Sequence, residues 1–304
     1  MKQSLSAAAM IGLFIFMLTF PKQTLSGASE GLLLWFQILL PTLLPFFILT
    51  NLLLQTNSIV YISYIIGPLF EKLFQVSHNG SFAVLSGFLC GYPVGAKVTA
   101  DMVRTNKITL EEGKYLLSFC NNTSPAFIMS FLVIQNLKDE SLLFLTLFIL
   151  YLSPILCSFL FRKIYCKKNT PIHPVSSQPE FKLNFRIIDE CIMNAFENIT
   201  KIGGYIILFS ILIALGENSP FSPLLPLLEI TNGIPRFIEI VPDFDLCYLL
   251  LMFLTSFGGV CAVAQTNSML HDTELSIFPY IIEKLITAMV TSLLVIVSIY
   301  CCKY

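Results

Sequence analysis

The stretch that decides the fold is Gly87-Phe-Leu-Cys-Gly-Tyr-Pro-Val-Gly-Ala-Lys97, followed after a polar connector by Leu116-Leu-Ser-Phe-Cys-Asn-Asn-Thr-Ser-Pro-Ala-Phe-Ile128. Glycine, proline and small polar residues interrupt apolar, membrane-type segments twice within this stretch. Inside hydrocarbon, a broken helix leaves main-chain N–H and C=O groups unpaired, so breaks persist only where protein buries them or where they line a wet cavity. Two breaks so close together favour a binding site over the alternative, which is two ordinary kinks packed by neighbouring helices.

The residues at the two breaks predict helix starts. Ser124 suits the N-cap position and Pro125 the first helical position, which needs no N–H group. Pro93, after Gly91-Tyr92, can start a second helix in the same way. Two helix N-termini at membrane depth would form a partly positive pocket, so we expect an anionic group to bind there.

The composition identifies an integral membrane protein. Of the 304 residues, 55% are hydrophobic and 12% are charged, and the mean hydropathy is +0.77. In a soluble domain about a quarter of the residues are charged. The apolar runs have helix length, which excludes a barrel, and the net charge of −1 gives no sign of nucleic-acid binding. The nine cysteines are scattered through apolar runs, so we expect no disulfides, no metal site and no cofactor.

The order of segments predicts four parts. Residues 81–95 span about 22 Å as a helix, against roughly 30 Å of hydrocarbon, which leaves open a half-helix, a re-entrant arm or a continued span. Residues 220–240, cut by prolines, leave the same question open. The predicted parts are a transmembrane helix at 1–28, a first repeat at 29–161, a basic loop at 162–190 and a second repeat at 191–304.

The loop 162–190 predicts the orientation of the chain. By the positive-inside rule its basic residues place it in the cytoplasm, together with the connector 97–114 two spans earlier. The basic residues of the loop are Arg162, Lys163, Lys167, Lys168, Lys182 and Arg186.

The two halves repeat one order of segments: a kinked span, an interrupted segment, a glycine-broken segment and a further span. The pairing aligns 84–102 with 251–269. Counted from a cytoplasmic N-terminus, the copies cross in opposite senses, which predicts an inverted-topology repeat with a substrate site at the midplane. The predicted fold is an all-α polytopic membrane protein with about 8–10 transmembrane or re-entrant helices, some of them broken.

The motifs at 87–97 and 117–127 resemble those of the YlbJ family of sporulation integral membrane proteins. That family belongs to the nucleoside recognition (Gate) domain proteins, which are related to concentrative nucleoside transporters. The segments 228–233 and 256–259, followed by Gln265, fit the same family. The resemblance implies a role in endospore formation, with dipicolinic acid, a planar dicarboxylate, moved across the outer forespore membrane.

The expected partners are the lipid bilayer and a small anionic substrate, with a coupling ion, further copies of the chain and other sporulation membrane proteins left open. A transporter is the first hypothesis, and a scaffold or gating subunit of a sporulation complex, or a nucleoside-type transporter, are the alternatives. The sequence shows no arrangement of catalytic residues that would predict an enzyme. The candidate substrate-binding residues are Gly91, Tyr92, Pro93, Gly95, Lys97, Asn121, Asn122, Thr123, Ser124, Glu229, Thr231, Asn232, Gly258, Gly259 and Gln265.

Two of these candidates carry charge and have alternative interpretations. Glu229 would repel an anion, so ion coupling or a polar network suits it better than substrate contact, and a solvated interfacial acid is the alternative. Lys97 could contact an anion or extend to the cytoplasmic interface as a snorkelling lysine.

Overall fold

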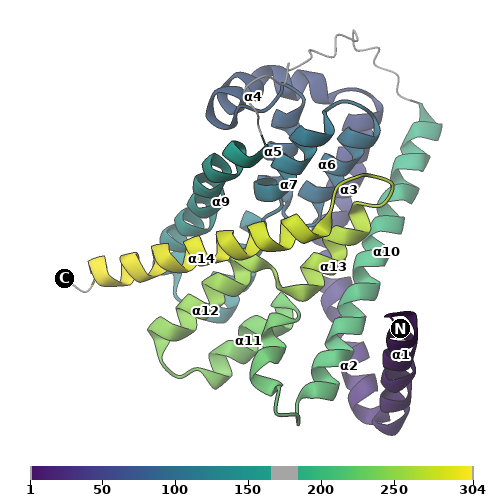
Figure 1. Cartoon of the computed structure of the whole chain (residues 1–304), viewed down its shortest axis with the longest axis vertical. Coiled ribbons are helices and arrows are strands. Elements are labelled where there is room, and N and C mark those ends of the chain that lie inside the picture. Colours follow the sequence, from purple (N-terminus) through teal and green to yellow (C-terminus); the bar gives the residue numbers. More distant parts are fainter. Residues whose placement is uncertain (1, 166–183, 303–304) are drawn as a thin grey trace.

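The computed structural model describes residues 2–165 and 184–302, and every regular element among them is a helix (Figure 1). Lys167, Lys168 and Lys182 of the basic loop lie outside the described residues. The helices are α1 (Lys2–Thr19), α2 (Pro21–Leu34), η1 (Trp35–Leu39), α3 (Leu40–Gln55), α4 (Ile59–Phe74), α5 (Gly80–Cys90), α6 (Val94–Arg104), α7 (Leu110–Cys120), α8 (Pro125–Phe127), η2 (Ile128–Leu137), η3 (Glu140–Leu142), α9 (Leu143–Tyr165), α10 (Phe185–Gly216), η4 (Ser222–Leu227), α11 (Ile230–Ile240), α12 (Phe244–Phe257), α13 (Gly259–Met269) and α14 (Ile277–Cys302).

Within the described residues, six helical runs are long and apolar enough to cross a membrane, and Met10–Thr19 and Gly80–Cys90 are shorter apolar helices. Large apolar side chains cover the outside of the molecule; Phe144, for example, is 84% exposed. The chain is therefore an all-α, multi-pass membrane protein in contact with the lipid bilayer, as the sequence predicts. The six runs are Pro21–Gln55, Leu110–Leu137, Glu140–Tyr165, Phe185–Gly216, Phe244–Met269 and Ile277–Cys301.

Helices α5 and α6 form a hairpin that bends at residues 91–93. Each arm has 11 residues, or about 16 Å of helix, which is too short to cross hydrocarbon alone. The arms touch at two glycines, since the Cα atom of Gly87 lies 2.9 Å from the position that a Cβ on Gly95 would take. Of the alternatives left open for 81–95, the structure supports the arm that turns back.

A second, shorter hairpin joins η4 to α11 through Leu228 and Glu229. Its arms also meet at a glycine, because a Cβ on Gly233 would lie 2.1 Å from the carbonyl oxygen of Pro226. Neither arm is long enough to span, so residues 220–240 turn back as well.

Two spans are broken in the middle. The first runs through α7, stops at Cys120 and resumes with α8 and η2, which confirms the predicted helix start at Ser124 and Pro125. The second runs from α12 into α13 through Gly258, whose φ of +89° is in the left-handed region that favours glycine. Each half of the chain thus contains one hairpin followed by one broken span.

Helix α10 runs without a break through the adjacent glycines Gly203 and Gly204. Residues 187–201 and 202–216 lie in one continuous 32-residue helix, α10. The glycines do not interrupt it: a Cβ on Gly203 would overlap Trp35, whose indole Nε1 donates a 2.9 Å hydrogen bond to the carbonyl oxygen of Ile199. Gly203 therefore allows α2 and η1 to pack closely against α10.

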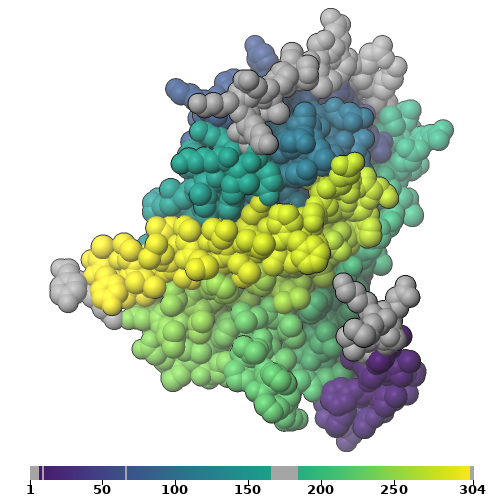
Figure 2. Space-filling view, viewed as in Figure 1, coloured from purple at the N-terminus to yellow at the C-terminus, as the bar shows by residue number. Residues whose placement is uncertain are grey.

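Helix α14 crosses the face shown in Figure 2 between the first-half helices above it and the green second-half segments below it. The predicted partners 84–102 and 251–269 are neighbours, since α6 contacts α13. The order of elements, however, suggests a different correspondence, with 80–104 matching 222–240 and 110–137 matching 244–269. The duplication and its inverted sense stay predictions.

Candidate functional site

Four interruptions of helical structure meet at one place, although they are far apart in the sequence. The amide of Tyr92 in the first hairpin donates a 2.6 Å hydrogen bond to the carbonyl oxygen of Asn122 in the first broken span. The amide of Cys261 donates a 2.7 Å bond to the carbonyl oxygen of Leu228 in the second hairpin. These bonds satisfy main-chain groups that the breaks would otherwise leave unpaired.

The two broken spans are also joined to each other. The hydroxyl of Thr123 donates a 2.6 Å hydrogen bond to the carbonyl oxygen of Thr255 on α12. The ring of Tyr92 lies against Gly258, since a Cβ there would be 3.3 Å from its Cε1 atom. The junction is therefore continuous from one half of the chain to the other.

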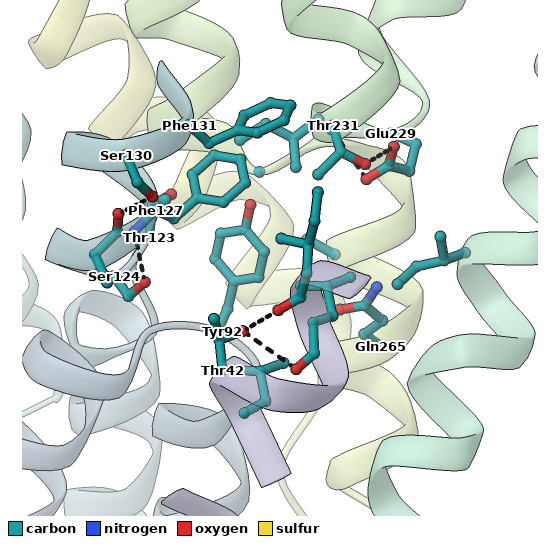
Figure 3. Close-up of a pocket in the computed structure, with 18 of the residues that line it drawn as sticks. Thr42, Tyr92, Thr123, Ser124, Phe127, Ser130, Phe131, Glu229, Thr231 and Gln265 are labelled. Atoms are coloured by element: carbon teal, nitrogen blue, oxygen red, sulfur yellow. Dashed lines mark hydrogen bonds between the residues drawn. The ribbon is translucent and has the colours of Figure 1, made fainter. Parts of the chain in front are cut away.

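A cavity of about 270 Å³ opens beside this junction (Figure 3). Seven of the predicted site residues line it: Tyr92, Thr123, Ser124, Glu229, Thr231, Gly258 and Gln265. Several further lining residues were not among the sequence candidates, and these include Gln37, Thr42, Phe127, Ser130, Phe131 and Gln135.

One wall of the cavity is aromatic, and the rest combines aliphatic side chains with mostly neutral polar groups. The rings of Phe127 and Phe131 stack with centroids 4.9 Å apart, and the Tyr92 ring stands beside them in Figure 3. Among the described residues that line the cavity none is lysine, arginine or histidine, and Glu229 is a carboxylic acid. The lining suits a small planar molecule that accepts and donates hydrogen bonds.

Glu229 is buried, with 3% of its surface exposed, so it is not a solvated interfacial acid. It is the N-cap of α11 and accepts hydrogen bonds from the amides of Thr231, at 3.0 Å, and Asn232, at 2.9 Å. The Thr231 hydroxyl, at 2.5 Å, and the Asn232 carboxamide, at 3.0 Å, add two more. Glu229 is thus the centre of a polar network, one of the two roles that its sequence context favours.

The helix N-termini predicted to bind an anion already have protein acceptors. Ser124 is the N-cap of α8, as predicted, and its hydroxyl accepts a 3.3 Å hydrogen bond from the amide of Phe127. Pro93 is the N-cap of α6, one position earlier than predicted. The amide of Ala96 in the first turn of α6 donates to the carboxamide oxygen of Asn121 at 3.2 Å. A bound anion would therefore have to compete with these protein acceptors for the same amide groups.

Asn121 and Asn122 lie on the buried side of the junction, away from the cavity lining. The Asn121 carboxamide donates 2.9 Å hydrogen bonds to the hydroxyls of Thr266 and Tyr280. The carbonyl oxygen of Asn121 and the side-chain oxygen of Asn122 accept bonds of 3.1 Å and 3.3 Å from Lys284 on α14. Lys284 was not among the sequence candidates, although two adjacent charged residues in the apolar run 277–302 are a signal.

The remaining glycine candidates shape the junction and carry no polar side chain. Gly91 has φ +80°, and a Cβ there would lie 2.6 Å from the amide nitrogen of Ser124. Gly259 also has φ +80°, while Gly95 packs against the first broken span. Gly91 therefore allows the hairpin bend to approach the break.

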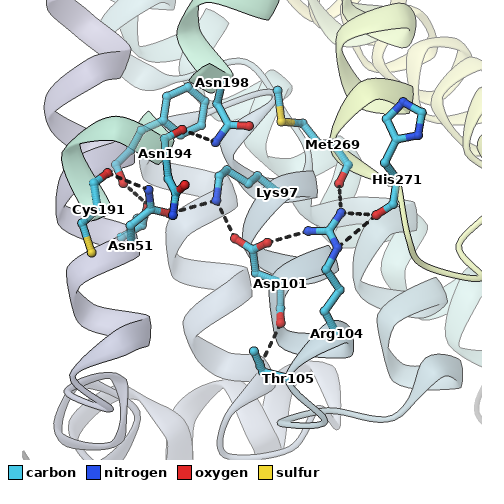
Figure 4. Close-up of polar contacts among 12 residues, drawn as sticks. Asn51, Lys97, Asp101, Arg104, Thr105, Cys191, Asn194, Asn198, Met269 and His271 are labelled. Carbon is cyan, nitrogen blue, oxygen red and sulfur yellow. Dashed lines mark hydrogen bonds and ion pairs between the residues drawn. The ribbon is translucent and has the colours of Figure 1, made fainter. Parts of the chain in front are cut away.

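Lys97 lies in a second chamber, of about 740 Å³, and not in the cavity (Figure 4). Its ammonium donates to the side-chain oxygens of Asn51 at 2.9 Å and of Asp101, one helical turn later, at 2.5 Å. Asp101 also pairs with Arg104, which donates a 2.7 Å bond to the carbonyl oxygen of Met269 at the end of α13. Lys97 is 7% exposed, so it is a buried member of an ion-pair network and not a snorkelling side chain.

Another lysine of this chamber, Lys107, follows α6 in the connector. Its ammonium donates to the carbonyl oxygen of Leu54 at 3.0 Å and to the side chain of Asn57 at 3.1 Å. Burial lowers the pKa of Lys107 from its ordinary value, because the charged form loses part of its hydration. The chamber combines cations, carboxylates and carboxamides, and so differs in character from the cavity.

The same three helices line the cavity and the chamber, each at different positions along its length. Helix α3 contributes Thr42 to the cavity and Asn51 to the chamber. Helix α13 contributes Gln265 to the cavity and Ser268 to the chamber. Helix α10 likewise contributes to both. Fully buried residues lie between the two sets in the sequence: Phe47 on α3, Ile202 on α10 and Thr266 on α13, and also Ala96 of α6, which lies between the cavity residue Tyr92 and the chamber residue Lys97. We call these four residues the seal.

The family resemblance predicted from the sequence is confirmed by comparison with known proteins. The Gate family, described as nucleoside recognition, matches residues 36–160, which contain the first hairpin and the first broken span. The chain is similar to the sporulation integral membrane protein YlbJ of Bacillus subtilis (strain 168), with 26% identity over 310 residues, covering 88% of this chain and 75% of that protein. No solved structure matches the chain.

Proposed function

We propose that this chain is a transporter of endospore formation that moves a small planar solute through the cavity and the chamber. The observation that supports the proposal is that α3, α10 and α13 line both spaces and carry fully buried seal residues between the two linings. Transporters place a substrate site at broken helices between two access routes. A scaffold needs neither two hollow spaces nor four interrupted elements at one point. We propose no catalytic role.

The proposed setting is the membrane system of the forming spore. The printed name of the relative, a sporulation integral membrane protein, supports this setting. Dipicolinate is our first candidate substrate and the outer forespore membrane our candidate location, because the resemblance of the motifs implies both. The flat ring of dipicolinate also matches the aromatic wall at Phe127 and Phe131.

The charge of the substrate is the point on which two candidates differ. The described lining of the cavity carries no basic side chain, and Glu229 is buried beside it. A dianion would therefore have to enter protonated or together with cations. A nucleoside is neutral and planar and forms many hydrogen bonds, so it fits this lining without such help. The description of the matching family, nucleoside recognition, also supports a nucleoside as the second candidate.

The deciding experiment measures uptake of dipicolinate and of uridine into proteoliposomes that contain only this protein. The matched variant is Glu229→Gln, which keeps the shape of the side chain and removes its charge. If dipicolinate is carried, we expect this variant to lower its apparent KM, because an electrostatic repulsion is removed. If uridine is carried, the variant should raise the KM for uridine, since a charged acceptor is replaced by a neutral amide.

Protein-free liposomes give the background for both solutes. Counterflow, in which unlabelled solute inside drives entry of labelled solute, separates carrier transport from leakage. Absence of counterflow for both solutes, with correctly inserted and monodisperse protein, would contradict the proposed transport and favour the scaffold.

A further inference from the structure

Lys284 buries its side-chain amine at the break of the first broken span. It is 2% exposed and lies on α14, inside a candidate membrane span. Its Nζ atom donates to two oxygens, the carbonyl oxygen of Asn121 at 3.1 Å and the carboxamide oxygen of Asn122 at 3.3 Å. Both acceptors are neutral.

No carboxylate forms an ion pair with Lys284 in the part of the chain that the structure describes. The neighbouring acid, Glu283, accepts a hydrogen bond from the hydroxyl of Tyr165 instead. A buried ammonium without a counter-charge is costly, so its position needs a compensating interaction.

The end of α7 supplies that compensation. Asn121 is the C-cap of this helix, and the carbonyl groups at a helix C-terminus carry partial negative charge. Half-helix C-termini and unwound carbonyl groups are also the elements with which transporters coordinate a coupling cation. The Asn121 and Asn122 oxygens thus form a cation site, and the side chain of Lys284 occupies it.

We propose that Lys284 is a resident cation, which takes the place that a diffusible monovalent cation would occupy at this break. The consequence rests on the proposed function: transport by this chain requires neither Na⁺ nor K⁺. Lys284 does not line the cavity. It acts as a positioning residue, because it holds the oxygens of residues 121 and 122 while the adjacent Thr123 and Ser124 line the cavity.

The test compares thermal unfolding of purified full-length protein in NaCl, KCl, ethylammonium chloride and choline chloride at equal ionic strength. The variants are Lys284→Ala, which empties the site, and Lys284→Met, which fills most of its volume without charge. We expect the wild-type midpoint to be the same in all four salts. Lys284→Ala should unfold several degrees lower in choline and recover in Na⁺, K⁺ or ethylammonium. Lys284→Met should unfold lower in every salt and recover in none.

Stabilisation of the wild type by Na⁺ or K⁺ over choline would overturn the proposal, as would equal responses of the alanine and methionine variants to the small cations. If Lys284→Ala does not fold, the wild-type salt series still decides. Because this readout measures cation binding and not flux, it is independent of transport. Absence of counterflow with the wild-type protein would contradict the proposed function but not the cation site. Na⁺-dependent counterflow would contradict only the proposal that Lys284 is a resident cation.

Discussion

The main-chain amide of Tyr92 lies 2.6 Å from the carbonyl oxygen of Asn122, so the bend of the first hairpin is hydrogen-bonded directly to the break of the first broken span. The corresponding contact in the second half joins the amide of Cys261 to the carbonyl oxygen of Leu228. Main-chain atoms make both contacts, and side-chain substitutions can affect them only through backbone conformation. The junction should therefore be most sensitive to substitution at its glycines.

Gly91→Leu tests this sensitivity. Gly91 has φ +80° and ψ −175°, a conformation that is essentially restricted to glycine and costs other residues about 1–3 kcal/mol. A Cβ there would also collide with Ser124. We expect transport to be lost and the unfolding midpoint to fall. The control is Gly204→Leu, on an exposed face of α10 with nothing within 4 Å of the added Cβ, and it should behave as the wild type in counterflow. Normal transport by Gly91→Leu would place the substrate site elsewhere.

Asn122→Leu separates the polar junction from simple packing. The substitution removes an acceptor of Lys284 and the 2.7 Å hydrogen bond from the Asn122 carboxamide to the carbonyl oxygen of Phe119. We expect uptake to fall by about tenfold or more, the equivalent of roughly 1.4 kcal/mol in the barrier, while insertion and abundance stay intact. Asn136→Leu is the matched control, since Asn136 makes a similar 2.7 Å bond to the carbonyl oxygen of Phe131 away from the junction. Equal effects of the two variants on uptake would indicate a structural role only.

The breaks could be predicted from sequence because their signals are local. Proline, a serine N-cap and consecutive asparagines stop and restart helices wherever they occur, and the break before Pro125 lies where they place it. The i,i+4 pair of Lys97 and Asp101 is local as well. Each of these features depends on at most a few neighbouring residues.

The partners of the breaks could not be predicted, because tertiary packing brings them together. Lys284 meets Asn122 across 162 positions of sequence. Whether the amide of Ala96 is free for a substrate depends on the side chain of Asn121, 25 positions away. Periodicity and caps indicate where a helix starts, but they carry no information on what already binds to its end.

The position of the chamber predicts how the chain is oriented in the membrane. Arg104, Lys107 and Lys201 line the chamber, so the positive-inside rule predicts that this end of the molecule faces the cytoplasm. We expect Glu111→Cys, at the exposed start of α7, to resist an impermeant thiol reagent added outside intact cells. Asn218→Cys, exposed beyond the opposite end of α10, should react. Both are made in a background without the native cysteines, and the reverse pattern of labelling would invert the topology.

Phe47 is the largest side chain of the seal, with none of its surface exposed, and it lies between the cavity residue Thr42 and the chamber residue Asn51 on α3. Phe47→Ala removes the ring and leaves a void of the kind that costs about 3–5 kcal/mol in a packed core. If the seal separates two access routes, the void should join them. We expect preloaded substrate to leave proteoliposomes faster than through the wild type, without saturation and without need for counter-substrate. Phe46→Ala is the matched control, because the same change is made at the adjacent residue, whose ring is 42% exposed on the outer face. A similar leak through both variants would reflect general loosening of α3, and no leak through Phe47→Ala in folded protein would mean that the two spaces do not belong to one pathway.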